Sequence, residues 1–254
     1  MAKNNHSKRE LEAKLDQLFF NQDFSSTGAD GSDIEKYLSA AALYAAVENG
    51  ISVLSDLKDR RSYIFYGQLG VTLGIAAHGE TRVLDTIWEE EILSHVAEAD
   101  LVQKQADELI FFSHVRKQER PNDHCMSSWL RMHDAAGEEH CVKHRIFYFT
   151  DGKSIRYALC LYNAASGFHK ALVTDTRSGR DTMLSQIAGK ESILSPREVE
   201  VLSMISRGMS SKEIAKALGI SVFTVSRHRQ NIIAAMNVKN STEACKMASL
   251  LEIL

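Results

Sequence analysis

The chain has 254 residues, enough for two modest domains that each bury a core. Its formal net charge of −3 is unevenly divided, because residues 190–254 carry +3 and the remainder carries −6. A basic end on an acidic body is typical of a protein in which one domain meets nucleic acid. No uncharged apolar run is long enough to span a bilayer and no signal sequence opens the chain, so we expect a cytoplasmic protein without a membrane partner. The four cysteines show no C-x-x-C spacing, which predicts reduced thiols.

Residues 1–32 are predicted to form a helix and a loop. Within them, residues 7–22 place apolar side chains on one face, at Leu11, Leu15, Leu18 and Phe19. Residues 23–32 are rich in Ser, Gly and Asp, which predicts the loop. A second helix is expected over residues 33–49, ended by Gly50. Its small apolar residues allow close packing on a partner helix or, equally, on its own domain.

The pattern changes to strands at Ile51. The stretch ISVLSDLKDRRSYIFYGQL predicts a hairpin with a charged turn. Residues 67–118 are predicted to be mostly helical. Three more strands are expected at MSSWLRMHD, EHCVKHRIFYF and SIRYALCLYNA, joined by the turn sequences AAGE and TDGK. Residues 167–190 then serve as the linker.

This order of elements over residues 33–166 resembles that of a PAS-like sensor domain. The resemblance is carried by ISVLSDLKDRRSYIFYGQLGVTLG, by VAEADL at the start of a helix, and by the hairpin LRMHDAAGEEHCVKHRIFYF. It implies an α+β domain, with a five-stranded antiparallel sheet and helices over one face. Such a domain would sense a signal, such as an unknown small-molecule ligand, or mediate dimerisation.

Histidines and cysteines gather in the last three strands of this domain. Imidazole and thiolate are ligands for zinc or iron, so a metal site is one interpretation. However, His140 and His144 lie about 13 Å apart on one strand, at ~3.3 Å per residue, and cannot share a metal. If AAGE closes the hairpin, His133 lies opposite His140, and that pair alone is an incomplete site. We therefore predict no metal at the cluster of His124, Cys125, His133, His140, Cys141 and His144.

Other enzymatic or cofactor chemistry finds no support in the sequence. No G-x-S-x-G elbow, Walker loop or H-E-x-x-H motif is present, so no catalytic residue is predicted. Nothing separates His95 or His114 from ordinary surface histidines as a haem ligand. Cys160 lies in an alternating strand and is expected to be a small buried hydrophobe. We predict no cofactor.

Local signals mark three short helices between residues 195 and 236. Ser195 with Glu198, and Ser210 with Glu213, have the S-x-x-E spacing of a capping box. Further starts and stops are expected at Pro196, Gly208, Gly219 and Ser221. Two capped helices joined by a Gly-containing turn form a helix-turn-helix, whose second helix normally enters the DNA major groove.

The helix expected from Val222 to Met236 has two distinct faces. Its apolar stripe is Val225, Ile232 and Met236, which should pack on the two preceding helices. The opposite face has no carboxylate and can donate to phosphates and base edges, through Thr224, Ser226, Arg227, Gln230 and Asn231. His228 and Arg229 lie at the borders.

Residues 191–254 resemble the LuxR-type (GerE-type) helix-turn-helix domain, an all-α unit of four helices. The matching stretches are LSPREVEVL, SSKEIAKALGIS, TVSRHRQNI and STEACKMASLLEIL. The resemblance implies that Lys212 and Thr224 contact phosphates, and that the fourth helix pairs two copies. It also implies that Ser226, Arg227 and Gln230, on the third helix, face base edges. Adding His228 from the border and Asn231 from the outer face completes the expected DNA-binding set, which is Lys212, Thr224, Ser226, Arg227, His228, Gln230 and Asn231. The expected dimerisation set is Ala244, Ala248 and Leu251.

Ser226 stands where the family often has Lys, so the base preference cannot be inferred from the sequence. The resemblance implies a dimeric, sequence-specific regulator of bacterial transcription that binds a two-fold operator in double-stranded DNA. RNA polymerase is a further candidate partner. Two alternatives stay open at this point. One is a sensor or scaffold protein whose C-terminal bundle binds protein, and the other is a protein similar to a sigma factor.

Overall fold

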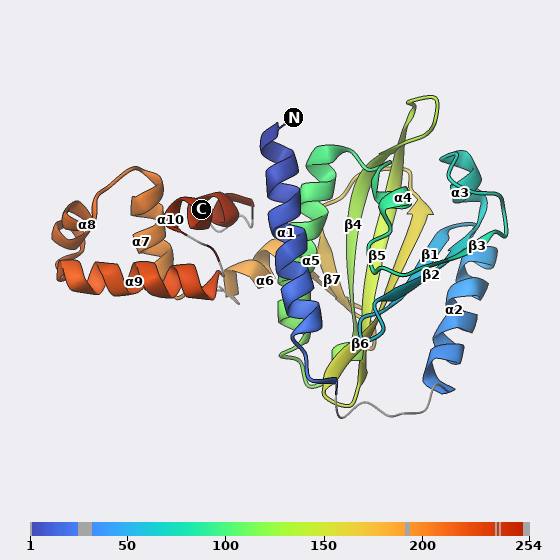
Figure 1. Ribbon diagram of the computed structural model, residues 1–254, viewed down its shortest axis with the longest axis horizontal. Coiled ribbons are helices and arrows are strands. Elements are labelled where there is room, and N and C mark those ends of the chain that lie inside the picture. The colour runs from blue at the N-terminus through green and yellow to red at the C-terminus, as the bar shows by residue number, and fades with distance from the viewer. Residues whose placement is uncertain (1, 25–31, 191–193, 237, 239, 251–254) are drawn as a thin grey trace. The chain divides into compact units, whose positions relative to one another are not determined.

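The computed structural model describes residues 2–24, 32–190, 194–236, 238 and 240–250. The chain divides into two compact units, Met1–Leu184 and Ser185–Leu254. Among the described residues, no helix is both long and apolar enough to cross a membrane. Figure 1 labels the helices and strands of each unit.

The N-terminal unit is built on one eight-stranded antiparallel sheet. The strands are arranged in the order β3-β2-β1-β6-β5-β4-β7-β8. Their bounds are β1 Ile51–Asp56, β2 Arg61–Tyr66, β3 Thr81–Leu84, β4 His124–His133, β5 Glu139–Asp151, β6 Ser154–Ala164, β7 Leu172–Asp175 and β8 Arg180–Met183. The helices of this unit are α1 Ala2–Phe20, α2 Ser32–Glu48, α3 Gln68–Thr72, α4 Glu90–Leu93 and α5 Glu98–Val115, with a 3₁₀ turn at Pro121–Asp123.

The prediction of a five-stranded sheet is wrong, because three short strands extend it. The five predicted strands form its centre, β2-β1-β6-β5-β4. β3 lies in a segment predicted to be helical, and it pairs with β2 as an edge strand. β7 and β8 lie within the predicted linker, and β7 pairs with β4. A four-residue strand is too short for its hydrophobic period to be recognised, so its neighbour in space decides its conformation.

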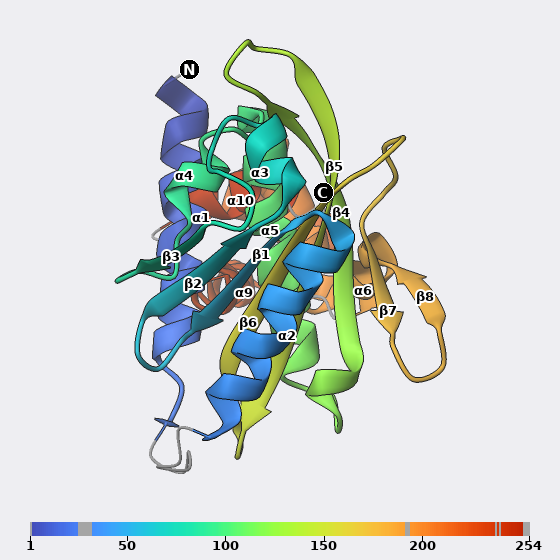
Figure 2. The same cartoon turned by 90° about the vertical axis from the view of Figure 1, so that its right-hand side faces the viewer.

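Helices cover both faces of the sheet, whereas the sequence predicted helices over one face. Figures 1 and 2 show α1 and α5 on one side of the sheet and α2 on the other. On the α2 side, Leu159 and Leu161 of β6 form a buried cluster with Ala41. Cys160, between them, lines a pocket under α5 instead. Because alternate side chains are covered from opposite sides, β6 is buried almost throughout and shows no polar face.

The two predicted N-terminal helices are present, and α1 belongs to the core. Leu11 and Leu15 are fully buried, and the ring of Phe19 meets Phe112 of α5 edge to face at 4.8 Å. At the end of α2 the left-handed residue is Asn49, with φ 54°, and not Gly50. Gly50 is needed for another reason, since a Cβ there would lie 2.4 Å from the carbonyl oxygen of Tyr162.

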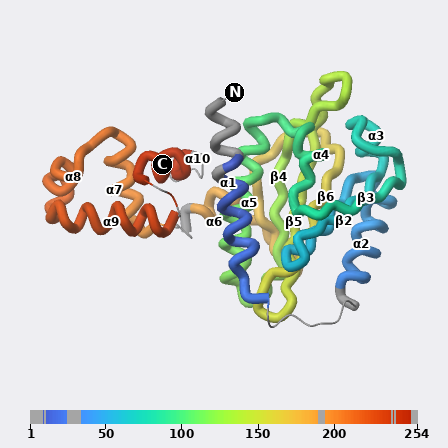
Figure 3. The backbone as a smooth tube through the Cα atoms, viewed as in Figure 1, coloured from blue at the N-terminus to red at the C-terminus, as the bar shows by residue number. Residues whose placement is uncertain are grey.

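The C-terminal unit is helical. Figure 3 follows the backbone through four successive helices, α7 Pro196–Ser206, α8 Ser211–Leu218, α9 Val222–Ala235 and α10 Ser241–Leu250. The short helix α6, Leu184–Lys190, precedes them. α7 packs on α9 and α10, and α8 packs on α9, so that α9 forms the centre of the bundle.

Candidate nucleic-acid interface and buried polar pocket

Local hydrogen bonds fix the starts of α7, α8 and α9. Both predicted capping boxes are confirmed, with the backbone N–H of Ser195 and of Ser210 each donating at 2.8 Å to the Glu three residues later. Ser221 accepts from the backbone N–H of Thr224 at 3.0 Å. The predicted stop at Gly219 is also confirmed, since this residue ends α8 in the left-handed conformation, with φ 65°.

The apolar stripe of α9 holds the helix-turn-helix together. Val225, Ile232 and Met236 are buried, as predicted from their spacing. Arg229, placed at the border of the helix by the sequence, has a structural role. Its guanidinium donates to the Ser211 hydroxyl of α8 at 2.9 Å and to the Ser241 hydroxyl of α10 at 3.2 Å. The orientation of α9 is therefore set by apolar packing and by the Arg229 guanidinium, which links α9 to α8 and α10.

The outer face of α9 carries the three predicted base-contacting residues. Ser226, Arg227 and Gln230 are exposed, and so is Lys212 near the start of α8. Thr224 is half-buried, and its hydroxyl hydrogen-bonds with that of Ser221 at 2.8 Å. This surface offers hydroxyl, guanidinium and amide groups on one rigid helix, which are groups able to read base edges.

The other two residues of the predicted DNA-binding set contact their own domain, although Asn231 is exposed and His228 is half-buried. The amide of Asn231 hydrogen-bonds with Glu198 in the first turn of α7, and the His228 ring lies near the same carboxylate. Burial raises the pKa of Glu198, but hydrogen bonds from Ser195 and Asn231 lower it to a net value below the ordinary one. The ring nitrogen Nδ1 of His228 is buried without a hydrogen-bond partner among the described residues.

Phe223 is a feature of this surface that the sequence reading missed. Its side chain is 79% exposed, an unusual position for a large aromatic residue. Phe223, Arg227 and Gln230 follow the spacing i, i+4, i+7, so they lie along one stripe of α9. This spacing is present in the sequence, but Phe223 was not predicted because only polar side chains were considered as DNA contacts.

The predicted dimerisation stripe on α10 needs correction. Ala244 and Ala248 are fully buried in their own unit, against α7 and α9, so they are not available to a second chain. Small residues permit the close helix approach that the sequence suggested, but the approach is within one chain. Leu251 lies outside the described residues.

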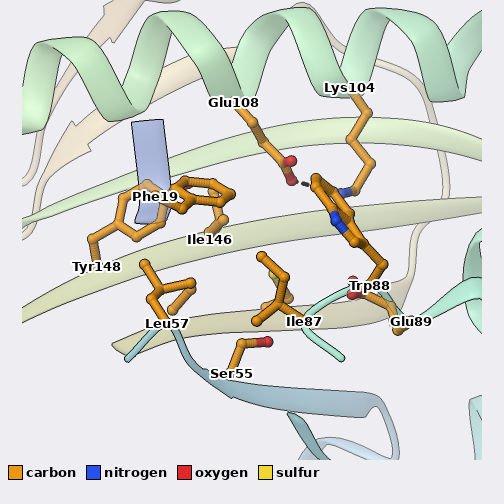
Figure 4. Close-up of a pocket in the computed structure, with 12 residues that line it drawn as sticks. Phe19, Ser55, Leu57, Ile87, Trp88, Glu89, Lys104, Glu108, Ile146 and Tyr148 are labelled. Atoms are coloured by element: carbon orange, nitrogen blue, oxygen red, sulfur yellow. Dashed lines mark hydrogen bonds and ion pairs between the residues drawn. The ribbon is translucent and has the colours of Figure 1, made fainter. Parts of the chain in front are cut away.

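A second site lies in the N-terminal unit, under α5. Figure 4 shows Lys104 and Glu108 pointing from α5 into a pocket whose other walls include Phe19, Trp88 and Tyr148. Lys104 Nζ donates to Glu108 Oε1 at 2.5 Å, and both side chains are almost completely buried. The cavity measures about 30 Å³. We call this site the polar pocket.

Buried polar groups continue from the polar pocket across the sheet. The Tyr162 hydroxyl donates to Glu89 at 2.8 Å, and Glu89 is 4% exposed. His144, fully buried on β5, lies 4.0 Å from Glu108. Burial lowers the pKa of His144 well below its ordinary value, as does the nearby charge of Lys104. Burial also raises the pKa of the Glu108 carboxyl, against the opposite effect of Lys104.

The predicted relation among the histidines is wrong in register. Met132 pairs with His140, and His133 pairs with Glu139. A shift of one residue reverses the face, so His133 and His140 point to opposite sides of the sheet and cannot chelate together. His140 instead hydrogen-bonds with Asp134 at 2.9 Å. All four cysteines are free.

The C-terminal unit is similar to known DNA-binding proteins. Residues 192–248 match the family model described as bacterial regulatory proteins, luxR family. The putative HTH-type transcriptional regulator YhjB of Escherichia coli is 34% identical over 94 residues, which are 37% of this chain and 44% of that protein. The oxygen regulatory protein NreC of Staphylococcus carnosus is 43% identical over 56 residues, or 22% of this chain and 26% of that protein. The chain thus spans less than half the length of these curated relatives. By this match, the helix-turn-helix of the C-terminal unit is similar to that of the luxR family.

Solved structures resemble the whole chain only weakly. The phage VqmA-DPO complex has 15% sequence identity and a TM-score of 0.31, covering 89% of this chain and 94% of that one. SdiA of Escherichia coli has 14% identity and a TM-score of 0.29, covering 96% and 98%.

Proposed function

We propose that this protein is a sequence-specific DNA-binding regulator of transcription and not an enzyme. One observation carries the proposal: Ser226, Arg227 and Gln230 are exposed on a helix whose start, stop and buried face are those of a recognition helix. Exposed Phe223 lies on the same stripe and adds an apolar group that suits a thymine methyl. Thr224 and Lys212 flank the stripe as phosphate contacts, whereas His228 and Asn231 position α9 against α7.

Selection of duplexes from a random pool by the full-length protein tests this proposal. A DNA-binding regulator enriches a defined sequence, and its affinity falls steeply with salt because phosphate contacts release counterions. A scaffold protein whose helical bundle binds protein would enrich no sequence. A protein similar to a sigma factor would bind promoter DNA together with RNA polymerase but not a palindrome by itself.

We further propose that two copies bind a two-fold operator with half-sites about 10 bp apart, or a multiple of this. The proposal is supported by the modest +3 charge of residues 190–254, which gives a single domain little affinity. The N-terminal unit would supply most of the dimer surface, since Ala244 and Ala248 are already buried. Sedimentation tests this division: a fragment lacking residues 1–185 should be monomeric and bind DNA weakly, whereas the intact chain should dimerise at micromolar concentration.

In this proposal the N-terminal unit is the PAS-like sensor, and its signal sets the spacing of the two recognition helices. The protein acts in the cytoplasm, where it meets DNA and RNA polymerase. The polar pocket is too small to accept an organic ligand without movement, since such sites measure about 300–1,000 Å³ and this cavity about 30 Å³. An organic signal that enters the polar pocket would therefore have to displace Trp88 or α1, and a change in Trp88 fluorescence on addition of the signal would report it.

A further inference from the structure

Three metal-ligating side chains converge beside the polar pocket, from three different elements. Glu108 comes from α5, His144 from β5 and Cys160 from β6, and one ligand atom of each lies within 4.8 Å of the others. All three side chains are buried, with His144 fully so. Carboxylate, imidazole and thiolate together form a ligand set that zinc-class ions prefer.

His144 has an unsatisfied atom directed at this group. Its Nδ1 lies 3.2 Å from the hydroxyl of Ser128, which fixes the orientation of the ring. Its Nε2 is buried and has no hydrogen-bond partner among the described residues, although it lies 4.0 Å from Glu108 Oε1. An unpaired buried nitrogen is costly, and a neutral imidazole whose other nitrogen is held by a hydrogen bond is a typical metal ligand.

The size of the cavity separates an ion from an organic molecule. Glu108 and Cys160 both line the polar pocket, and its volume of about 30 Å³ is enough for one bound ion with a water molecule. Around a tetrahedral zinc ion, ligand atoms are about 3.5 Å apart. The three side chains therefore need to move inward by about 1 Å, which rotamer adjustment can provide.

The formal charges also favour a cation. Glu89 and Glu108 contribute two carboxylates, and Lys104 contributes one ammonium. Both carboxylates act on Lys104, so it retains a counter-charge at Glu89 when Glu108 turns to a metal. With Cys160 as thiolate, three negative charges face one positive charge, and a divalent ion balances the difference.

We propose that Glu108, His144 and Cys160 form a binding site for one zinc-class divalent ion, with a water molecule as fourth ligand. Binding displaces the Cys160 proton to solvent and ties α5 to β5 and β6. This proposal does not rest on DNA binding, so the two can fail separately.

The test uses full-length protein without a histidine tag, reduced and stripped of metal, and then loaded with Co²⁺ or Zn²⁺. After dialysis we expect about one equivalent of metal per chain. The Co²⁺ form should show a thiolate-to-cobalt charge-transfer band and the visible bands of a tetrahedral site. Cys160→Ala and His144→Gln should remove the charge-transfer band, or lower metal retention at least tenfold. Cys245→Ser, which changes a thiol in the other unit, should do neither.

Each variant is checked for folding by its tryptophan emission, because Trp88 and Trp129 both lie in the N-terminal unit. If folded wild-type protein retains no metal, the cluster is a buried ion pair only and the proposal is wrong. The same conclusion follows if Cys160→Ala binds Co²⁺ with an unchanged spectrum. If His144→Gln does not fold, the spectrum of Cys160→Ala decides alone, since alanine keeps a small apolar group at that position.

Discussion

The two units of this protein place their polar side chains in opposite ways. In the C-terminal unit, hydrogen-bonding groups lie at helix starts, such as Ser195 and Ser210, or on the exposed face of α9. In the N-terminal unit, Lys104, Glu108 and His144 are buried between α5 and the sheet. The capping serines are satisfied within three residues of the chain. In the N-terminal unit the Lys104–Glu108 pair lies within α5, but His144 reaches Glu108 only because β5 packs against α5.

This difference has energetic consequences. An exposed polar group can exchange its protein partner for water, so removing one alters binding but barely alters stability. A buried charge has no such substitute, and removing its partner leaves it unpaired in a medium of low polarity. Substitutions in the C-terminal unit should therefore change DNA recognition, whereas substitutions in the polar pocket should change folding.

The largest effect is expected from Lys104→Met. It leaves the Glu108 carboxyl buried beside Glu89 without its cation, which should lower the free energy of unfolding by about 3–5 kcal/mol. Urea denaturation followed by tryptophan fluorescence, in the presence of a chelator, measures this for the N-terminal unit. The double variant Lys104→Met/Glu108→Leu should recover most of the loss, because an apolar pair replaces the ion pair.

A matched control is Arg61→Met, which breaks an ion pair with Asp85 whose side chains are 50% and 87% exposed. Its cost should be below about 1 kcal/mol, as for most surface pairs. If Lys104→Met costs no more than this control, the contrast between buried and exposed polar groups does not hold.

Arg227→Ala should have the largest effect on DNA recognition. It removes the exposed guanidinium of α9, and one good base contact contributes about 1–3 kcal/mol of discrimination. Competition between a selected operator and random DNA measures the loss, and the melting temperature should be unchanged. Equal discrimination by wild type and variant would mean that Arg227 does not read bases. Gln230→Ala is the companion test one turn further along.

The C-terminal unit could be predicted almost completely from sequence, because its determinants are local. A serine followed three residues later by Glu specifies a helix start whatever lies elsewhere in the chain, and both boxes formed as expected. The inward stripe of α9 followed in the same way from its spacing. The burial of Ala244 and Ala248 could not be foreseen, because small residues favour close packing without specifying the partner.

The N-terminal unit was predicted in outline but not in its site. The central strands were located, since β4, β5 and β6 are long and bounded by turns. The group of Glu108, His144 and Cys160 was not predicted, because Glu108 and Cys160 are distant in sequence from the histidine cluster between His124 and His144. Moreover, the one-residue register difference at His133 and Met132 cannot be inferred from the turn sequence alone. Only pairing between strands brings His144 and Cys160 to one face.

Lys212→Ala is expected to weaken binding to all DNA sequences about equally. Lys212 is exposed near the start of α8, and loss of one phosphate contact should lower the slope of log affinity against log salt by about one unit. Titrations at several salt concentrations, with operator and random duplexes, measure it. A changed base preference with an unchanged slope would assign Lys212 to base contact instead.

Ser210→Ala should destabilise α8 locally, by about 1 kcal/mol, because it removes an N-cap. The hydrogen bond from Ser210 also holds the pKa of Glu213 below its ordinary value. Because the pKa of Glu213 is lowered in the folded state, the stabilisation from the hydrogen bond between the Ser210 hydroxyl and the Glu213 carboxylate is present above about pH 4.5. It is lost as the pH falls further and the carboxylate is protonated. Amide exchange of α8 should thus be faster in the variant at pH 7, and the difference should shrink in acid. Ser206→Ala, on the exposed side of α7, should change neither.

The smallest effect is expected from Phe223→Ala, and it tests whether the exposed stripe of α9 reads shape as well as hydrogen bonds. A thymine methyl buried against the ring contributes about 0.8 kcal/mol, the value of one methylene-sized group removed from water. Replacing each operator thymine by deoxyuridine removes the methyl and leaves every hydrogen-bonding group in place. At one position this should weaken binding of the wild type by about fourfold and leave binding of Phe223→Ala unchanged. If both proteins respond equally to every uracil, Phe223 contacts no methyl group, and its 79% exposure belongs to a surface used for something other than DNA.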